Sequence, residues 1–234
     1  MRAFTTTRAG GFSAPPYASL NLGLHVGDDD SCVARNRAEV ARRLSLPQEP
    51  GWIRQTHSTR ATLLESESES ETESGREADA AITRQAGIVA AIMTADCLPV
   101  LLCNREGTEV AALHAGWRGL QAGIIDATLA RMQTPASELL AWIGPGISQA
   151  HFEIGTDVHD AFVGADTGAA AYFRANRPQH WLCDLGGLAE AVLRDAGVAS
   201  VTRSEHCTYR DAGLFYSYRR EATTGRMASL IWIS

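Results

Sequence analysis

Aliphatic residues concentrate in three short runs near the middle of the chain, GIVAAIMTA at 87–95, LPVLLC at 98–103 and TEVAALHAG at 108–116. Each run is rich in aliphatic and β-branched residues and is separated from the next by a short turn, a pattern typical of buried strands. We expect the three strands to lie in one sheet, where the ends of strands are neighbours in space.

Apolar residues recur with the period of a helix in VARNRAEVARRLSL, residues 33–46, shortly after the aspartates at 28–30 and Ser31. Aspartate supplies an N-cap and a favourable charge for the first turn of a helix. Val33, Val40 and Leu44 form one apolar stripe, and the helical period places Arg37 on the same stripe. Arg37 therefore either extends its charged end to solvent or pairs with a nearby carboxylate, or it projects into a site and holds an anion.

The remaining periodic segments predict further helices and strands, with no internal repeat. They are a helix over 117–132, a short strand over 141–147 that ends in a Gly-Pro-Gly turn, helices over 156–163 and 184–196, and a terminal strand over 227–234. This alternation predicts an α+β fold, in which mixed β-sheets are covered by helices.

The 234 residues are 45% hydrophobic, which suits one folded domain, 1–234, with a substantial core. The formal charge of −6 comes largely from five glutamates in the low-complexity segment ESESESETESGR at 65–76. That segment has no apolar side chains, so we expect a flexible, solvated acidic loop. The rest of the chain is nearly neutral, which argues against nucleic-acid binding and favours small or neutral partners.

The N-terminal residues lack the continuous apolar segment of a signal peptide, and no stretch approaches the roughly 18 apolar residues of a membrane span. The five cysteines are odd in number, scattered and without a C-x-x-C pair, which favours free thiols in a reducing compartment. We therefore expect a cytoplasmic protein that does not bind membranes. Nothing in the sequence indicates a protein partner.

Cys97 and His114 are the first candidates for chemistry, because Cys97 lies in the turn between the first two predicted strands and His114 ends the third. They are compatible with ordinary core and turn residues, with a thiol nucleophile and its base, or with two metal ligands. Their spacing alone does not decide among these interpretations.

Several motifs follow one another along the chain: SLNLGLHVGD and then NR, QTHS, TADCLPVLLC, HAGWRGL, IGPGI, and FYSYRR before TGRMASLIW. Together they resemble a family known as laccase-like multicopper polyphenol oxidoreductases, and also as purine nucleoside phosphorylases and peptidoglycan editing factors. The resemblance extends from Thr6 to Ile233 and implies one α+β domain with four layers, α/β/β/α.

The resemblance implies that His57 of QTHS, Cys97 of TADC and His114 of HAGWRG are catalytic residues that hold the metal. Two imidazoles and a thiolate are a recognised catalytic zinc set, which leaves the fourth position open for water or substrate. Copper also suits these ligands, because its intrinsic affinity exceeds that of zinc. The resemblance offers no fourth protein ligand, which a closed structural zinc site would need.

Ser58 departs from the family, which usually has glycine after the first histidine. If that position adopts a positive φ, serine brings modest strain. His25 matches a position that relatives commonly fill with histidine, so we expect it just outside the metal ligands. The histidines beyond the motifs are expected to be structural or at the surface: His151, His159, His180 and His206.

Asn21 of SLNLG, Arg37 of NR and Arg118 of HAGWRG are the residues that we expect to bind substrate. Arg118 begins a predicted helix, whose free N–H groups favour an anion such as phosphate. Other roles stay open: Arg219 and Arg220 as anion ligands or salt-bridge partners, Asp79 as an acid, a base or a surface residue, and Cys207 as a packing residue.

The resemblance implies a zinc-dependent enzyme that acts on purine nucleosides, by phosphorolysis of adenosine, inosine, guanosine or methylthioadenosine and by deamination of adenosine. Its partners would then be nucleoside and phosphate. Phosphorolysis requires an anion beside the ribose and a stabilised leaving base, so a metal with an open position near arginines suits it.

Three alternatives remain. A cysteine or metal-dependent amidase that edits muramyl-peptide precursors would use Cys97 as nucleophile and His114 as base. A copper polyphenol oxidase would need H-x-H ligand pairs, and the sequence contains none. A non-catalytic module would use its metal only to stabilise the fold, and would unfold when the metal is chelated.

Overall fold

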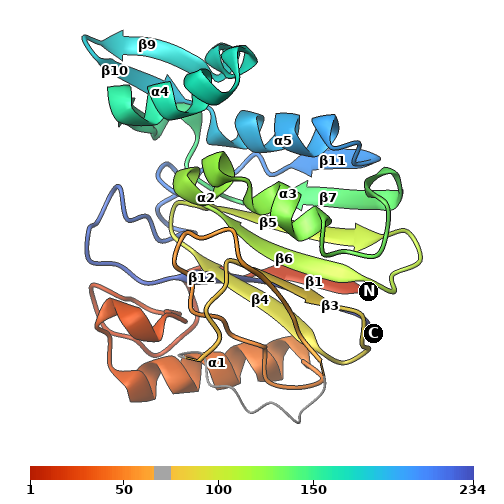
Figure 1. Ribbon diagram of the computed structural model, residues 1–234. Coiled ribbons are helices and arrows are strands. Elements are labelled where there is room, and N and C mark those ends of the chain that lie inside the picture. The colour runs from red at the N-terminus through yellow and green to blue at the C-terminus, as the bar shows by residue number, and fades with distance from the viewer. Residues whose placement is uncertain (66–74) are drawn as a thin grey trace.

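The computed structural model describes residues 1–65 and 75–234 (Figure 1). The strands are β1 (Arg2–Thr5), β2 (Ala61–Leu63), β3 (Ala80–Thr83), β4 (Val89–Thr94), β5 (Leu98–Asn104), β6 (Val110–Ala115), β7 (Leu139–Ile143), β8 (Glu153–Gly155), β9 (Phe173–Arg177), β10 (His180–Cys183), β11 (Ser200–Arg203) and β12 (Met227–Trp232). The helices are α1 (Asp30–Leu44), α2 (Trp117–Ala122), α3 (Ile124–Leu129), α4 (Thr156–Ala165) and α5 (Leu185–Asp195). Most of the predicted acidic loop 65–76 lies outside the described residues.

The strands form two main sheets and a separate third sheet. The six-stranded sheet has the order β11-β7-β5-β6-β3-β2, with parallel pairing at β11–β7 and β2–β3 and antiparallel pairing elsewhere. The smaller of the two main sheets, called the smaller sheet below, is antiparallel and has the order β1-β12-β4. The chain between β7 and α5 forms the third sheet, β8-β10-β9, beside α4. The fold is mixed α+β, as predicted.

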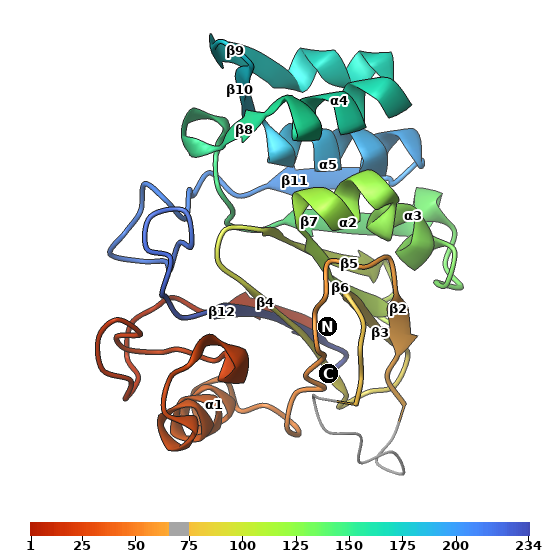
Figure 2. The same cartoon turned by 60° about the vertical axis from the view of Figure 1, so that its left-hand side comes forward.

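The two main sheets and their helices are stacked in four layers (Figures 1 and 2). Helices α2, α3 and α5 cover one face of the six-stranded sheet, where Leu102 and Ile125 share a buried cluster. The β1-β12-β4 sheet lies against the other face, and Leu101 and Ile92 belong to the cluster between the sheets. Val40 of α1 packs in a third cluster, on the outer face of the smaller sheet. This arrangement is the α/β/β/α order that the resemblance implies.

Strands β4 and β5 are buried along their whole length, which explains their unbroken apolar sequences. Helix α1 begins as predicted, with the Asp29 carboxylate accepting the N–H groups of Ser31 and Cys32. In the described part of the chain, no helix combines the length and the apolar character that crossing a bilayer requires.

Two details differ from the sequence prediction. The expectation that β4, β5 and β6 share one sheet is wrong, because β4 pairs with β12 whereas β5 and β6 pair with each other in the six-stranded sheet. The short turn after β4 therefore crosses from one layer to the next. The helix predicted over 117–132 is divided into α2 and α3 at Gly123, whose left-handed φ of 95° ends the first helix.

Glu109 is a buried carboxylate that ties the turn after α3 to the start of β6. It is 3% exposed and accepts hydrogen bonds from Arg84 Nε at 2.7 Å and from the N–H groups of Gln133 and Thr134 at 2.9 and 2.8 Å. Burial alone raises the pKa of Glu109, but these hydrogen bonds outweigh it and lower the pKa below its usual value.

We expect Glu109→Gln to lower the free energy of unfolding by about 2 kcal/mol near pH 7, because hydrogen bonds to charged groups contribute about 1.5–3 kcal/mol. Since folding lowers the pKa of Glu109, its stabilising effect is fully present above the ordinary value of 4.5 and is lost as the pH falls below it. Urea unfolding at neutral and acidic pH measures the difference. The exposed Glu106→Gln is the control, and a difference that persists or grows on acidification would contradict this account.

Candidate metal centre

Three potential metal ligands meet although they are far apart in sequence. His57 lies in the loop before β2, Cys97 in the turn between β4 and β5, and His114 near the end of β6. Their ligand atoms all lie within 4.8 Å of one another, with 3.9 Å between Cys97 Sγ and His57 Nε2. The imidazole centroids are 4.8 Å apart. We call these three residues the ligand cluster.

Strand pairing and a glycine bring the ligand cluster together. Leu98 of β5 is opposite Ala115 of β6, so the next residues outward, Cys97 and Gly116, are also adjacent. A Cβ at Gly116 would lie 2.8 Å from Cys97 Sγ and 2.9 Å from His57 Cδ2, closer than real side chains pack. The glycine of the HAGWRG motif therefore leaves the space in which the ligands converge.

The buried carboxylate of Asp79, just before β3, holds both histidines. Its Oδ1 accepts the N–H of His57 at 3.0 Å and lies 2.8 Å from Nδ1 of His114. Its Oδ2 accepts the N–H groups of Thr56 and Ser58 and the Ser58 hydroxyl. Because an ionised carboxylate only accepts, Nδ1 of His114 is the donor and its Nε2 is left for a metal.

His57 has a left-handed φ of 60°, which is uncommon for a residue other than glycine. Three consecutive N–H groups, at 56, 57 and 58, converge on the Asp79 carboxylate and stabilise this conformation. The strain expected at Ser58 is therefore not found there, because the positive φ falls on the preceding residue. Ser58 instead donates its hydroxyl to Asp79 Oδ2 at 2.7 Å, a bond that glycine cannot make.

The charges of the site stabilise one another. Burial alone raises the pKa of Cys97, but the charge of His114 and hydrogen bonds with both histidines lower it to about 6. Burial lowers the pKa of His114, yet Cys97 and Asp79 raise it to about 9. Burial likewise raises the pKa of Asp79, and its hydrogen bonds with His114 and Ser58 lower it to about 2. Cys97 is thus held as a thiolate, the form that binds metals and attacks electrophiles.

The ligand cluster fits a zinc-type ion. Zinc binds imidazole nitrogen at about 2.0–2.1 Å and thiolate at about 2.3 Å, which places tetrahedral ligand atoms roughly 3.3–3.6 Å apart. The observed 3.9 Å between Cys97 Sγ and His57 Nε2 is a few tenths of an ångström longer, and the cluster as a whole, within 4.8 Å, would contract by up to about 1 Å around an ion. A histidine whose other ring nitrogen is bound to a carboxylate is also the usual arrangement of a metal ligand. These three residues can hold a metal ion.

Two of the expected substrate residues support the backbone of the SLNLG segment. Asn21 is fully buried, and its Oδ1 accepts the N–H groups of Gly23 and Arg226 at 3.0 and 2.9 Å. Arg37 is 9% exposed and donates from Nε and Nη2 to the carbonyl oxygen of Leu22. Both side chains therefore shape the segment on which Arg226 rests.

The other residues singled out from the sequence have varied surroundings. Arg118 is exposed at the start of α2, with its guanidinium 4.3 Å from the centre of the Trp117 ring. His25 is exposed and lies outside the ligand cluster. Arg220 donates to three backbone carbonyls, and Cys207 is buried with its sulfur accepting two bonds from one serine. The remaining histidines stack on aromatic rings or bond to nearby oxygens: His151, His159, His180 and His206.

A cavity of about 130 Å³ adjoins Cys97. The aromatic residues Trp117, Phe152 and Tyr218 line it, and Arg219 borders it. Phe152 and Tyr218 were missed in the sequence, since a lone aromatic residue has no pattern that distinguishes a cavity wall from core. Tyr218 nevertheless lies in the FYSYRR motif, which was an available signal.

Asp96 joins the turn that contains Cys97 to the C-terminal part of the chain. Its Oδ1 accepts the hydroxyl of Thr208 at 2.6 Å, and its Oδ2 accepts the N–H of Arg219 at 2.7 Å. Both oxygens are therefore engaged in positioning the segment 208–219 beside the ligand cluster. Asp96 was also missed, although its place next to Cys97 in the TADC motif pointed to it.

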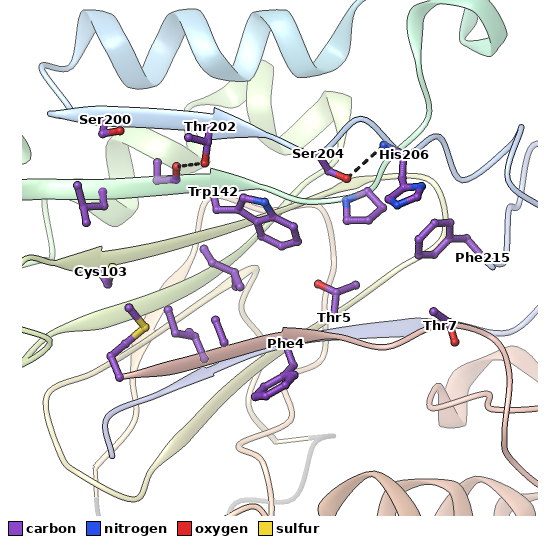
Figure 3. Close-up of a pocket in the computed structure, with 17 residues that line it drawn as sticks. Phe4, Thr5, Thr7, Cys103, Trp142, Ser200, Thr202, Ser204, His206 and Phe215 are labelled. Atoms are coloured by element: carbon purple, nitrogen blue, oxygen red, sulfur yellow. Dashed lines mark hydrogen bonds between the residues drawn. The ribbon is translucent and has the colours of Figure 1, made fainter. Parts of the chain in front are cut away.

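A larger cavity, about 660 Å³, lies away from this site, between β1 and the strands β7 and β11 (Figure 3). Phe4, Trp142 and Phe215 are among its lining residues, and no member of the ligand cluster is. Cys103 also lines it, but burial raises the pKa of this thiol and keeps it unreactive. The smaller cavity, by contrast, is lined by Cys97 of the ligand cluster.

We expect Asp79→Asn to weaken zinc binding by about 10–100-fold, the usual effect of removing a group that orients a metal ligand. A neutral amide accepts weakly from His114 and from the three N–H groups that hold His57. Competition with a chromophoric chelator measures the affinity, and the exposed Asp126→Asn is the matched control. Unchanged zinc affinity in folded Asp79→Asn would show that the carboxylate does not position the ligands.

The comparisons with known proteins agree over the whole chain. A family model described as multi-copper polyphenol oxidoreductase laccase matches residues 2–234. The chain is 44% identical over 231 residues to the purine nucleoside phosphorylase YfiH of Escherichia coli (strain K12), which covers 99% of this chain and 93% of that protein.

Two solved structures have the same fold. A crystal structure of a Neisseria meningitidis protein matches with a TM-score of 0.91 at 43% identity, covering 99% of this chain and 93% of that one. The crystal structure of Bacillus licheniformis hypothetical protein YfiH matches with a TM-score of 0.93 at 28% identity, covering 99% and 92%. On its sequence and its fold, the chain belongs to the family described as multi-copper polyphenol oxidoreductase laccase.

Proposed function

We propose that this protein is a zinc-dependent enzyme that acts on purine nucleosides, by phosphorolysis of adenosine, inosine, guanosine or methylthioadenosine and by deamination of adenosine. The ligand cluster carries the proposal, because within the described residues it offers three ligands rather than four. Catalytic zinc keeps such an open position, whereas structural zinc is closed by four protein ligands. The name of the Escherichia coli relative supports purine nucleosides as the substrate class.

The cavity beside Cys97 suits a purine base. Trp117, Phe152 and Tyr218 line it, and aromatic rings stack favourably on flat heterocycles. A base held there would place the nucleoside next to the ligand cluster, with the positive charge of Arg219 at the edge of the cavity. Binding a nucleoside between aromatic walls also excludes water from the reacting bond.

Each part of the site has a defined role in this proposal. A bound zinc ion would supply Lewis-acid stabilisation of the negative charge that develops during reaction. Asp79 keeps both histidines in place, and the Cys97 thiolate reduces the net positive charge of the site. Such fixed groups need no rearrangement when charge develops in the transition state. This electrostatic preorganisation supplies much of the rate enhancement of many enzymes.

One observation favours a second candidate, the cysteine amidase that edits muramyl-peptide precursors. The lowered pKa of Cys97 and the raised pKa of His114 describe a thiolate and imidazolium pair, as cysteine hydrolases use. In that reaction Cys97 would attack a carbonyl carbon and His114 would protonate the departing amine. The two candidates differ in their need for a metal, which an experiment can test.

Oxidation of polyphenols by several copper ions has less support. The sequence has no H-x-H pair, and the described residues contain one group of three close ligands, the ligand cluster. A single copper ion is compatible with its two nitrogens and one sulfur. Analysis of the purified protein must therefore measure copper as well as zinc.

We expect Cys97→Ser to lower zinc per chain and to reduce phosphorolysis and deamination of adenosine together, each by about 100-fold or more, because both reactions depend on one ion. His57→Ala and His114→Ala should produce the same joint loss, whereas His151→Ala, outside the ligand cluster, should not. Elemental analysis gives metal per chain. Adenine and inosine formed from adenosine, with and without phosphate, give the two activities.

The same experiment separates the alternatives. Full activity after metal removal, or a Cys97→Ser variant that keeps its zinc but is inactive, would identify Cys97 as a nucleophile and overturn the zinc proposal. If chelation unfolds the protein and the loaded form has no activity on nucleosides, the metal is structural.

A further inference from the structure

Arg226, in the TGRMAS segment, directly precedes β12 of the smaller sheet. Met227 at the start of β12 is opposite Thr94 at the end of β4, so Arg226 lies beside the turn that leads to Cys97. The segments 8–29 and 204–226 lie on the same side of the molecule as this turn (Figure 2). Arg226 is therefore placed where a second substrate could meet a nucleoside.

The arginine is held in one position. Its backbone N–H donates to Asn21 Oδ1 at 2.9 Å, and its Nη1 donates to the carbonyl oxygens of Thr224 and Gly225, both at 3.0 Å. A Cβ on Gly23 would lie 2.9 Å from Arg226 Cγ, so this glycine leaves room for the arginine stem. The Nη1 contacts fix the plane of the guanidinium before any ligand arrives.

The other edge of the guanidinium, Nε and Nη2, is available. In the structure of residues 1–65 and 75–234 neither atom has a hydrogen-bond partner, and the buried polar atoms without partners are Arg220 Nε and Thr224 Oγ1. Nε and Nη2 of Arg226 therefore reach solvent. This edge is the one that Arg42 uses to bind both oxygens of Glu39, and it matches carboxylate or phosphate oxygens in the same way.

The guanidinium of Arg226 is partly removed from water, which strengthens its hydrogen bonds to an anion. Burial lowers the pKa of Arg226, and the nearby groups Cys97, Asp96 and Tyr218 act in the opposite direction. No ion pair joins Arg226 to another described residue, and both oxygens of Asp96 are engaged with Thr208 and Arg219. A partly dehydrated guanidinium with a free bidentate edge binds phosphate oxygens strongly.

We propose that the Nε and Nη2 edge of Arg226 binds the inorganic phosphate that attacks the nucleoside. The inference rests on the proposed phosphorolysis and names the phosphate ligand of that same site. Asn21 and Arg37 then act as positioning residues, since they support the segment on which Arg226 rests. Arg118, the phosphate ligand expected from the sequence, lies on the Trp117 ring at the surface and is not needed for this role.

The test compares arginine variants of the zinc-loaded enzyme in inosine phosphorolysis. Arg226→Gln is expected to raise the KM for phosphate by roughly 10–100-fold, as the loss of charge-assisted hydrogen bonds predicts, while zinc per chain and the KM for inosine stay within about twofold. Arg226→Lys keeps the charge without the bidentate edge and should give a smaller increase. Arg118→Gln tests the other candidate phosphate ligand. The matched control is Arg105→Gln, in the exposed turn between β5 and β6, where the KM for phosphate should change little.

Calorimetric titration of phosphate into the zinc-loaded variants tests binding without turnover. If the wild-type protein does not cleave inosine, yet binds phosphate more tightly than Arg226→Gln does, the proposed function fails and the phosphate site stands. If the wild-type protein cleaves inosine and Arg226→Gln keeps the wild-type KM for phosphate, the site assignment fails and the function stands. A large rise in the KM for phosphate in Arg118→Gln, without one in Arg226→Gln, would also overturn the assignment of the phosphate site to Arg226. If Arg226→Gln does not fold, Arg226→Lys decides by the same readouts.

Discussion

The hydrogen bonds to one buried carboxylate, that of Asp79, determine the geometry of the whole site. Asp79 accepts three consecutive backbone N–H groups, one hydroxyl and the Nδ1 proton of His114. The first three hold His57 in its left-handed conformation, and the last fixes which nitrogen of His114 faces the cluster. Burying an ionised carboxylate is unfavourable unless it is fully hydrogen-bonded, so the site and the local fold stabilise each other.

The four layers explain why the site lies where it does. The turn after β4 carries the chain from the smaller sheet to the six-stranded one, and Cys97 lies in that crossing. His114 comes from the larger sheet, Arg226 from the smaller one, and Asp96 links the crossing to the C-terminal segment. Cavity and ligands are thus assembled from segments that are distant in sequence, as in many enzymes whose catalytic groups lie on loops at strand ends.

Much of the fold could be predicted from the sequence, because β4, β5 and β6 are apolar runs buried along their whole length and α1 carries an apolar stripe at helical period. The shorter strands were missed, because three to five residues are too few to show a period: β1, β2, β8, β9, β10 and β11. The crossing between sheets was also missed. The sequence of a short turn does not show whether the next strand pairs in the same sheet or in another one. The division of α2 from α3 depends on the conformation of a single glycine.

The site could be predicted in part. His57, Cys97 and His114 lie in the motifs, and the structure brings their ligand atoms together. The contacts of Asp79 and Arg226 could not be read from the sequence, because each depends on backbone groups brought near by tertiary folding. For Arg37, which had two open interpretations, the structure shows a bond to the backbone of Leu22. Motif membership therefore identified important residues without distinguishing those that meet a ligand from those that support the backbone.

The most direct measurement of the central claim is X-ray absorption at the zinc edge of the zinc-loaded protein, with the Asp79→Asn variant alongside. The account predicts two imidazole nitrogens at about 2.0 Å and one sulfur at about 2.3 Å, with an oxygen in the remaining position. It also predicts that the scattering from the two imidazole ligands is weaker or less ordered in the Asp79→Asn variant. A zinc environment without sulfur, or one with four protein ligands, would contradict the claim that His57, Cys97 and His114 form an open metal site braced by Asp79.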